Sequence, residues 1–149
     1  MVGHMPNVRP VSSDINGYIE QSDKSVDIIF GISVMTHLPI EVMKIWLKEL
    51  CRVIKDDGLL LLTVVGDGSL AFTSRWLKPE VLNTWSNNGY IVLENNNETD
   101  GDIGGEGYYV QTMINEENLR EAWRDYVDVL EFIPAVFGYQ DMVVCRPKT

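Results

Sequence analysis

The feature that most constrains the fold is a nearly unbroken apolar run that begins at Val26 and ends at Val34. Branched and aromatic side chains dominate it without alternating with polar ones, which is typical of a strand buried on both faces of a parallel sheet. A second such run lies at 59–65. Between them, apolar residues recur at helical spacing after Pro39, which predicts a helix that the turn at 56–58 stops. The two strands and the helix form a β-α-β unit, the usual element of α/β folds.

The rest of the chain continues with alternating helices and short strands. Pro79 and Glu80 predict the start of a second helix, which ends at Gly89 in a left-handed cap. Asn115 is expected to cap a third helix that extends to about Arg124. We expect strands at 90–93, 108–114, 127–133 and 142–145, the last two as an antiparallel pair, and a polar loop at 95–107.

Length and composition predict a single domain. The chain has 149 residues, 45% of them hydrophobic, which is enough for one compact core and too little for two ordinary ones. We expect residues 12–149 to form this domain as a three-layer α/β half-domain. Residues 1–11, with a second methionine at Met5, are expected to be a disordered or tag-derived lead.

The charge balance excludes several kinds of partner. The sequence has 22 acidic and 12 basic side chains and a net charge of -10, so phosphate backbones and anionic lipid surfaces are repelled. No apolar run approaches the roughly 20 residues that span a bilayer. Cys51 and Cys145 lie far apart, which predicts neither a disulfide framework nor a metal site. We therefore expect a cytoplasmic protein that binds neither nucleic acid nor membrane.

Two segments resemble class I S-adenosylmethionine-dependent methyltransferases. SVDIIFGISVMTHL at 25–38 resembles the family's fourth strand and the loop after it, and LKELCRVIKDDGLLL at 47–61 resembles the next helix and fifth strand. In the second segment, the turn at 56–58 replaces the family's usual Pro-Gly-Gly. GYQDMVV at 138–144 is similar to the last strand of a subset of these enzymes. SDI at 13–15 looks like the segment after the third strand.

The resemblance covers residues 12–147 and implies a truncated Rossmann-like methyltransferase fold. Its mixed sheet would have parallel strands four and five closed by an antiparallel pair. The family's glycine-rich turn after the first strand, and its acidic residue at the end of the second, have no counterpart in the sequence. The glycines in the acidic loop at 95–107 lie too far downstream to replace that turn.

The family's strand order implies that the run at 26–34 is an open edge. An apolar edge strand exposes unpaired backbone groups, and natural proteins rarely tolerate this. We therefore expect either a homodimer paired across the strand from Val26 to Val34 or a complementing chain that covers it. A chain on its own is expected to be inactive.

The resemblance also implies site residues. His37 would be a base that removes a proton from the methyl acceptor, although it could instead cap the helix after Pro39 or simply pack. Asp14 and Ser33 would contact S-adenosylmethionine. Residues implied to contact a small-molecule acceptor, each with a packing or turn role as the alternative, are Arg75, Trp76, Gln140 and Asp141.

Other chemistries fit the sequence less well. The segment at 31–35, with Ser33 at its centre, lacks the second glycine of a hydrolase nucleophile elbow. His4 and His37 are the only histidines, and neither has a carboxylate pair at helical spacing, so we expect no metal site. Two functions remain open. One is methyl transfer from S-adenosylmethionine to a small molecule, and the other is a non-catalytic dimeric binding or assembly module.

Overall fold

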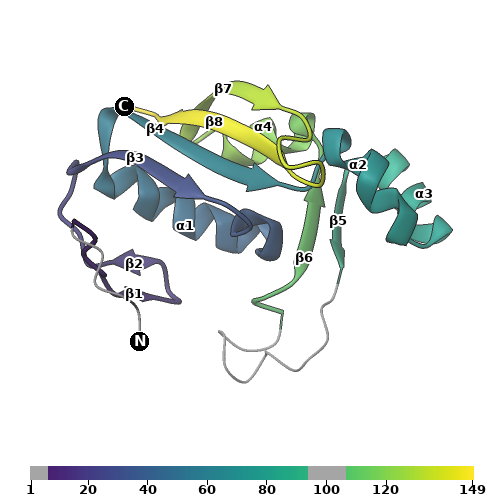
Figure 1. Ribbon diagram of the computed structural model, residues 1–149, viewed down its shortest axis with the longest axis horizontal. Coiled ribbons are helices and arrows are strands. Elements are labelled where there is room, and N and C mark those ends of the chain that lie inside the picture. The colour runs from purple at the N-terminus through teal and green to yellow at the C-terminus, as the bar shows by residue number, and fades with distance from the viewer. Residues whose placement is uncertain (1–6, 94–106) are drawn as a thin grey trace.

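The computed structural model describes residues 7–93 and 107–149. Its centre is a four-stranded sheet of order β3-β4-β8-β7 (Figure 1). Strand β4 is parallel to β3 and antiparallel to β8, and β7 is antiparallel to β8. The mixed sheet with two parallel strands closed by an antiparallel pair is therefore confirmed. The strands are β3 (Val26–Gly31), β4 (Ile54–Val64), β7 (Val127–Ile133) and β8 (Asp141–Pro147).

Two helices cover one face of this sheet, α1 (Ile40–Val53) and α4 (Glu116–Trp123) (Figure 1). Asn115 caps α4 as expected, because its side chain accepts a hydrogen bond from the Asn118 N–H. The core lies between these helices and alternate side chains of the strands. Its fully buried members include Met43, Leu47, Leu60, Leu62, Leu119, Trp123, Val143 and Cys145.

The other face of the sheet has no covering helix among the described residues. On this face Phe30 is 66% exposed and Ile28 is 49% exposed. The expected three layers are therefore two in the part of the chain that the structure describes. The reason is that both helices that pack on the sheet, α1 and α4, lie on the same side of it (Figure 1).

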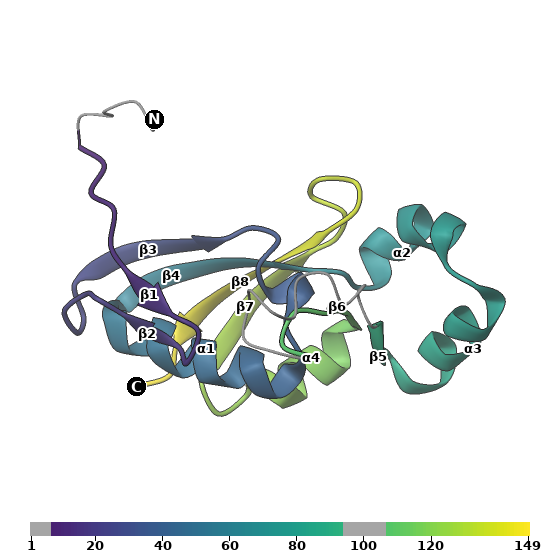
Figure 2. The same ribbon diagram turned by 90° about the horizontal axis from the view of Figure 1, so that it is seen from below.

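A smaller unit extends from one end of the sheet (Figure 2). Trp85 is the largest residue of its own small core, which also contains Val65, Ile91 and Met113. Gly89 ends α3 with a φ of 63°, which confirms the predicted left-handed cap. The elements are α2 (Asp67–Thr73), the 3₁₀ turn η2 (Ser74–Trp76), α3 (Pro79–Asn88) and an antiparallel pair, β5 (Tyr90–Leu93) and β6 (Gln111–Ile114).

A hairpin that the sequence did not predict precedes the main sheet. It comprises β1 (Ser13–Asp14) and β2 (Tyr18–Ile19) and contacts α1 (Figure 2). Its turn contains Gly17 at a φ of +82°, where a Cβ would lie 2.6 Å from Ile45 on α1. Glycine therefore allows both the turn and the close approach to the helix.

Several boundaries differ from the sequence predictions. Helix α1 ends at Val53 and β4 begins at once, so residues 56–58 belong to a strand rather than to a helix-stopping turn. The parallel register shifts there, from Val26 beside Ile54 to Ile28 beside Leu59. Strand β3 ends at Gly31. The predicted loop at 95–107 falls almost entirely outside the described residues, as do residues 1–6 of the expected lead.

Candidate functional site

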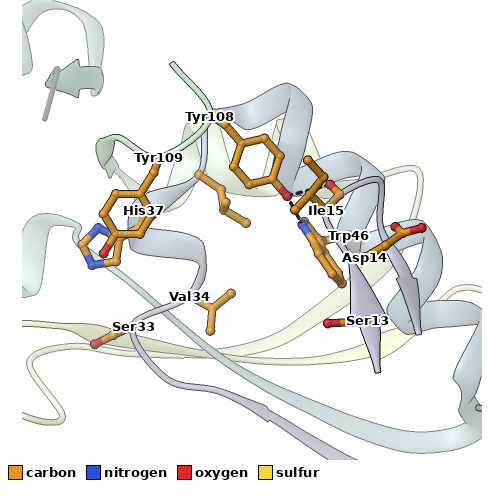
Figure 3. A pocket seen from close by; sticks show the side chains of 10 residues that line it. Ser13, Asp14, Ile15, Ser33, Val34, His37, Trp46, Tyr108 and Tyr109 are labelled. Carbon is orange, nitrogen blue, oxygen red and sulfur yellow. Dashed lines mark hydrogen bonds between the residues drawn. The ribbon is translucent and has the colours of Figure 1, made fainter. Parts of the chain in front are cut away.

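A pocket of about 310 Å³ lies beyond the carboxyl end of β3 (Figure 3). In open α/β sheets, ligands bind beyond the carboxyl ends of the strands. Four segments contribute to the pocket: the β1–β2 hairpin, the turn after β3, helix α1 and the residues before β6. The lining residues are Ser13, Asp14, Ile15, Ser33, Val34, His37, Leu38, Trp46, Tyr108 and Tyr109.

Ser33 occupies a constrained position in the turn after β3. Its φ of 56° is in the left-handed region, which costs a non-glycine residue about 1–3 kcal/mol and persists only where the surroundings hold it. Two contacts do so: the Ser33 N–H donates to Thr63 Oγ1 at 2.8 Å, and Gln140 Nε2 donates to Ser33 Oγ at 2.6 Å. This geometry ends β3 and turns the chain toward His37.

His37 lies in the 3₁₀ turn η1 (Met35–His37) and is half-buried. Its Nδ1 is 3.2 Å from the carbonyl oxygen of Val110, and its ring stacks on Tyr109 with 4.5 Å between centroids. A carbonyl can only accept, so this contact assigns a proton to Nδ1. In the neutral ring, Nε2 is then the nitrogen that can accept a proton.

Asp14 is exposed and its carboxylate folds back onto its own hairpin. Its Oδ1 accepts from the N–H groups of Asn16, at 2.8 Å, and Tyr18, at 3.2 Å. These bonds hold the β1–β2 turn, and within the described residues the structure gives no bond to Oδ2. One carboxylate oxygen therefore fixes the loop and the other faces solvent.

The hairpin is attached to α1 through a partly buried ion pair. Glu49, whose side chain is 10% exposed, accepts from Arg52 Nη2 at 2.6 Å and Nε at 2.9 Å, and from the Ile19 N–H at 2.7 Å. Arg52 also donates to the carbonyls of Ile19 and Gln21. These bonds from Arg52 lower the pKa of the Glu49 carboxyl, against the opposing effect of burial. The pair thereby fixes the loop that contributes Asp14 to the pocket.

Two aromatic side chains form one wall of the pocket. Trp46 Nε1 on α1 donates to the Tyr108 hydroxyl at 3.0 Å, and that hydroxyl donates to the Ile15 carbonyl at 2.8 Å (Figure 3). These bonds use the polar atoms of both rings. A ligand would therefore contact mainly the faces of these two rings, together with the apolar side chain of Val34.

The pocket continues along the free side of β3. A space of about 440 Å³ shares Ser13, Val34 and Trp46 with it and extends along Ile29 and Phe30. A further space of about 330 Å³, which includes Ile19 and Ile29, follows toward the start of the strand. The three spaces make a largely apolar groove between β3, α1 and the hairpin.

The other residues singled out from the sequence lie outside this pocket. Gln140 is buried and contacts it only through Ser33. Asp141 is fully buried and accepts from the N–H groups of Gly68, at 3.1 Å, and Ala135, at 2.8 Å. Burial raises the pKa of its carboxyl, although these two bonds act in the opposite direction. Arg75 and the 78% exposed Trp76 lie on η2, in the smaller unit.

Within residues 7–93 and 107–149, no group of three or more His, Cys, Asp or Glu side chains is placed to hold a metal ion. A search of the same residues finds no helix with the length and apolar character needed to cross a membrane.

Comparisons with known proteins identify the fold. No protein-family model and no curated protein matches the chain. Among solved structures, a protein of Pyrococcus horikoshii OT3 matches with a TM-score of 0.59 and 16% identity, over 95% of this chain and 60% of that one. An S-adenosylmethionine-dependent methyltransferase of Methanosarcina mazei matches with a TM-score of 0.58 and 14% identity, over 90% and 65%.

A third similar structure is the Burkholderia thailandensis 1,6-didemethyltoxoflavin-N1-methyltransferase with bound 1,6-didemethyltoxoflavin and S-adenosylhomocysteine. It has a TM-score of 0.58 and 10% identity, over 87% of this chain and 47% of that one. The chain thus spans about half to two thirds of the length of these structures. Its fold is part of a Rossmann-like methyltransferase fold, as the sequence resemblance implied.

The structure brings together three of the predicted site residues, Asp14, Ser33 and His37, in one pocket. The aromatic wall was missed because Trp46 is one of the apolar residues at helical spacing after Pro39, a pattern typical of core packing, and Tyr108 and Tyr109 begin the segment at 108–114 that was expected to be a strand. Trp46 and Tyr108 are 62 positions apart. Only the tertiary packing of α1 against the segment before β6 places these two rings beside the cavity.

Proposed function

We propose that this chain is the acceptor-side part of an S-adenosylmethionine-dependent methyltransferase. The observation that carries the proposal is that Asp14, Ser33 and His37 line one pocket beyond β3 in a fold of the methyltransferase type. The similar Burkholderia enzyme contains a small-molecule acceptor and S-adenosylhomocysteine. A small-molecule acceptor is accordingly the proposed substrate class.

The residues present fit one end of the cofactor. Asp14 has a solvent-facing carboxylate oxygen that can accept from an amine or a hydroxyl, and Ile15 and Val34 offer apolar contacts beside it. When bound, S-adenosylmethionine supplies a methyl group on a positively charged sulfur. The described residues have no glycine-rich turn beside this pocket, so binding to the chain alone is expected to be weak and turnover absent.

His37 is the proposed base. With its Nδ1 proton directed at the Val110 carbonyl, Nε2 can take a proton from a hydroxyl or amine of the acceptor. Stacking on Tyr109 fixes the ring plane, so the imidazole is held in one orientation. Ser33 and Gln140 act indirectly, by holding the turn that places His37.

The test is isothermal titration of S-adenosylhomocysteine into the wild-type chain and two variants. Asp14→Asn removes a charge in the pocket, and Asp57→Asn removes one from an exposed aspartate on β4. We expect Asp14→Asn to weaken binding about tenfold, the effect of one charge-assisted hydrogen bond. Equal affinity in both variants, or no heat in the wild type, would contradict a cofactor contact at Asp14.

A second candidate function, an assembly module, is favoured by the uncovered sheet face. Strand register and alternation put seven apolar side chains on it, all exposed or half-exposed: Ile28, Phe30, Leu59, Leu61, Ile133, Met142 and Val144. Sheets with parallel strands are normally covered on both faces. We propose that a second copy of the chain packs on this face.

Charge is compatible with this self-association. The chain has a net charge of -10, but the charged side chains bordering the face include both signs, with Asp128 and Glu131 on β7 and Arg146 on β8. Near the start of β3, Asp27 pairs with Lys55 at 2.6 Å. Twofold packing therefore does not bring two acidic surfaces together.

A further inference from the structure

Strand β3 lies at one edge of the main sheet and has a free side. Among the described residues it pairs only with β4. Thr63 Oγ1 on β4 donates to the Gly31 carbonyl at 3.5 Å, and the Asp27 carbonyl also faces β4. In an extended strand, the N–H and C=O groups of successive residues point to opposite sides. The odd-numbered residues of β3 therefore bond to β4, and the backbone groups of Ile28 and Phe30 point outward.

This edge has little that would discourage pairing with another strand. Natural proteins protect edge strands with charged side chains, proline, bulges or very short length. Asp27 is the one charged residue in β3, and Lys55 pairs with it at 2.6 Å. The strand presents a straight backbone of about 20 Å, from its length and a rise of about 3.3 Å per residue. Its outward N–H and C=O groups are thus open to an added strand.

An apolar groove follows the same edge on the side of α1. Its two parts, of about 440 and 330 Å³, extend along β3 from Val34 to Val26. Both parts are lined by Ile29 on β3, Leu50 on α1 and Ile19 on the hairpin. A strand paired with β3 would direct alternate side chains into this groove and onto the uncovered sheet face. Both surfaces are apolar, so they fit a strand that is apolar on both faces.

A second copy of β3 is a poor occupant of this groove. The side chain of Ile29, which faces α1, already packs on the core of its own chain. The hairpin and α1 of that copy would line the same side of its own strand. Pairing two β3 strands about a twofold axis would therefore bring no free side chain into either groove. The occupant must be a strand whose side chains are not yet packed.

We propose that the free edge of β3 binds an extended polypeptide segment of about six to eight residues, with branched apolar side chains on both faces, from outside this sequence. The similar solved structures contain further chain of this kind of fold, because this chain spans only 60%, 65% and 47% of them. The segment lies along β3 and leaves the pocket beyond its carboxyl end free. The proposal therefore does not rest on methyl transfer.

The experiment is fluorescence anisotropy of a labelled synthetic peptide titrated with the full chain. The peptide alternates valine and isoleucine over seven residues, with one lysine and one glutamate at each end so that its net charge is zero. N-methyl groups on alternate residues block one of its edges, which prevents self-association, and the other edge can still pair. The control peptide has N-methyl groups on both edges. We expect it to bind at least about tenfold more weakly, and equal binding or none by either peptide would overturn the proposal.

Amide hydrogen exchange locates the bound peptide. We expect the peptide to slow exchange at Ile28 and Phe30 at least about tenfold, and to leave Ile29 and Gly31 unchanged because these already bond to β4. Protection on β7, at the opposite edge of the sheet, in place of β3 would overturn the proposal. Protection of Ile28 and Phe30 in the free chain that rises with its concentration would assign the edge to a second copy and would also overturn it.

Matched valine variants test the groove. Val11 is 45% exposed and lines the groove, whereas Val8 is 64% exposed and lies just upstream of it. We expect Val11→Asp to weaken peptide binding at least about fivefold, because it puts a charge beside an apolar strand. Val8→Asp should leave binding unchanged. Similar losses in both variants would overturn the assignment.

A second pair of variants tests the backbone of β3. Phe30→Pro removes an outward N–H, which an edge strand tolerates, and Phe30→Leu retains it. We expect the proline variant to lose peptide binding at least about tenfold and the leucine variant to stay within about twofold of wild type. Equal binding by the two would contradict pairing along this edge. If the proline variant does not fold, the exchange at Ile28 and the valine pair decide the matter.

Discussion

Gln140 and Ser33 are 107 positions apart in the sequence, and Gln140 Nε2 donates a hydrogen bond to Ser33 Oγ at 2.6 Å. The contact joins the segment before β8 to the turn after β3. Gln140 is only 5% exposed, and Ser33 has a left-handed φ of 56°. A strained backbone residue is thus held by a buried amide at the edge of the candidate site.

Substitutions of Ser33 should separate the contribution of its hydrogen bond from the cost of its left-handed backbone conformation. Ser33→Ala removes the hydrogen-bond partner of a buried amide and is expected to lower the free energy of unfolding by about 1–3 kcal/mol. Ser33→Gly loses the same partner but adopts a positive φ freely, so it should lose about 1 kcal/mol less than the alanine variant. Urea unfolding measures both, and an alanine variant as stable as the glycine variant would contradict strain at this position.

The ion pair of Glu49 and Arg52 should make stability depend on pH in the acidic range. The pKa of Glu49 is lowered in the folded protein, chiefly by hydrogen bonds from Arg52. Its stabilising contribution is therefore present above the unfolded pKa of about 4.3 and is lost as the pH falls through the folded pKa. We expect Glu49→Gln to cost about 1–3 kcal/mol at neutral pH, with the difference from wild type shrinking in acid.

The control for this prediction is Glu117→Gln, which changes an exposed glutamate in the first turn of α4. Thermal unfolding followed across pH 3–7 should show little effect in the control, about 0.5 kcal/mol or less. A cost for Glu49→Gln that persists undiminished in acid would mean that the carboxylate charge contributes nothing.

Asp141 should tolerate an amide better than an apolar residue. Its two carboxylate oxygens accept from the Gly68 and Ala135 N–H groups, and burial raises its pKa. Asp141→Ala leaves both donors unsatisfied, at about 1–3 kcal/mol each. Asp141→Asn keeps one acceptor and removes a buried charge, so we expect a smaller loss at neutral pH. In the wild type, the buried Asp141 carboxyl ionises as the pH rises through its folded pKa, which lowers the stability of the wild type. The stability of the asparagine variant relative to wild type should therefore rise over the same pH range.

Chemical denaturation of the two variants at neutral and acidic pH tests this order. An asparagine variant less stable than the alanine variant at neutral pH would contradict it.

Self-association should depend on the uncovered sheet face. We expect a dimer in sedimentation equilibrium at micromolar concentration, and we expect Ile28→Lys to give a monomer because it puts a charge in a buried apolar interface. The matched control is Ile45→Lys, since Ile45 on α1 has the same 49% exposure but lies outside this face. A monomeric wild-type chain would exclude the second copy and leave the face to another polypeptide.

The sequence predicted those parts of the fold that depend on local pattern. The apolar runs that became β3 and β4, the Asn115 cap and the Gly89 left-handed cap are all short-range features. The β1–β2 hairpin was missed because its strands are two residues each and its pairing depends on Gly17 packing against α1. The early start of β4 was missed because the acidic pair Asp56 and Asp57 is typical of turns.

Local sequence pattern likewise predicted some residues of the candidate pocket and not others. Asp14, Ser33 and His37 follow strands or turns that the family resemblance places at one sheet edge. Trp46 and Tyr108 carry no such local signal, since each has the pattern of a packing residue. Their hydrogen bond forms only once α1 and the segment before β6 are brought together by tertiary structure.

A titration of the ¹⁵N-labelled chain with S-adenosylhomocysteine, followed by amide chemical shifts, tests most directly whether the pocket beyond β3 holds the cofactor. We predict shifts that cluster on Asp14, Ile15, Ser33 and Val34, with an affinity near the millimolar end of the scale, about -4 to -5 kcal/mol. Shifts that spread over the surface without a cluster, or none at millimolar ligand, would contradict a cofactor site beyond β3.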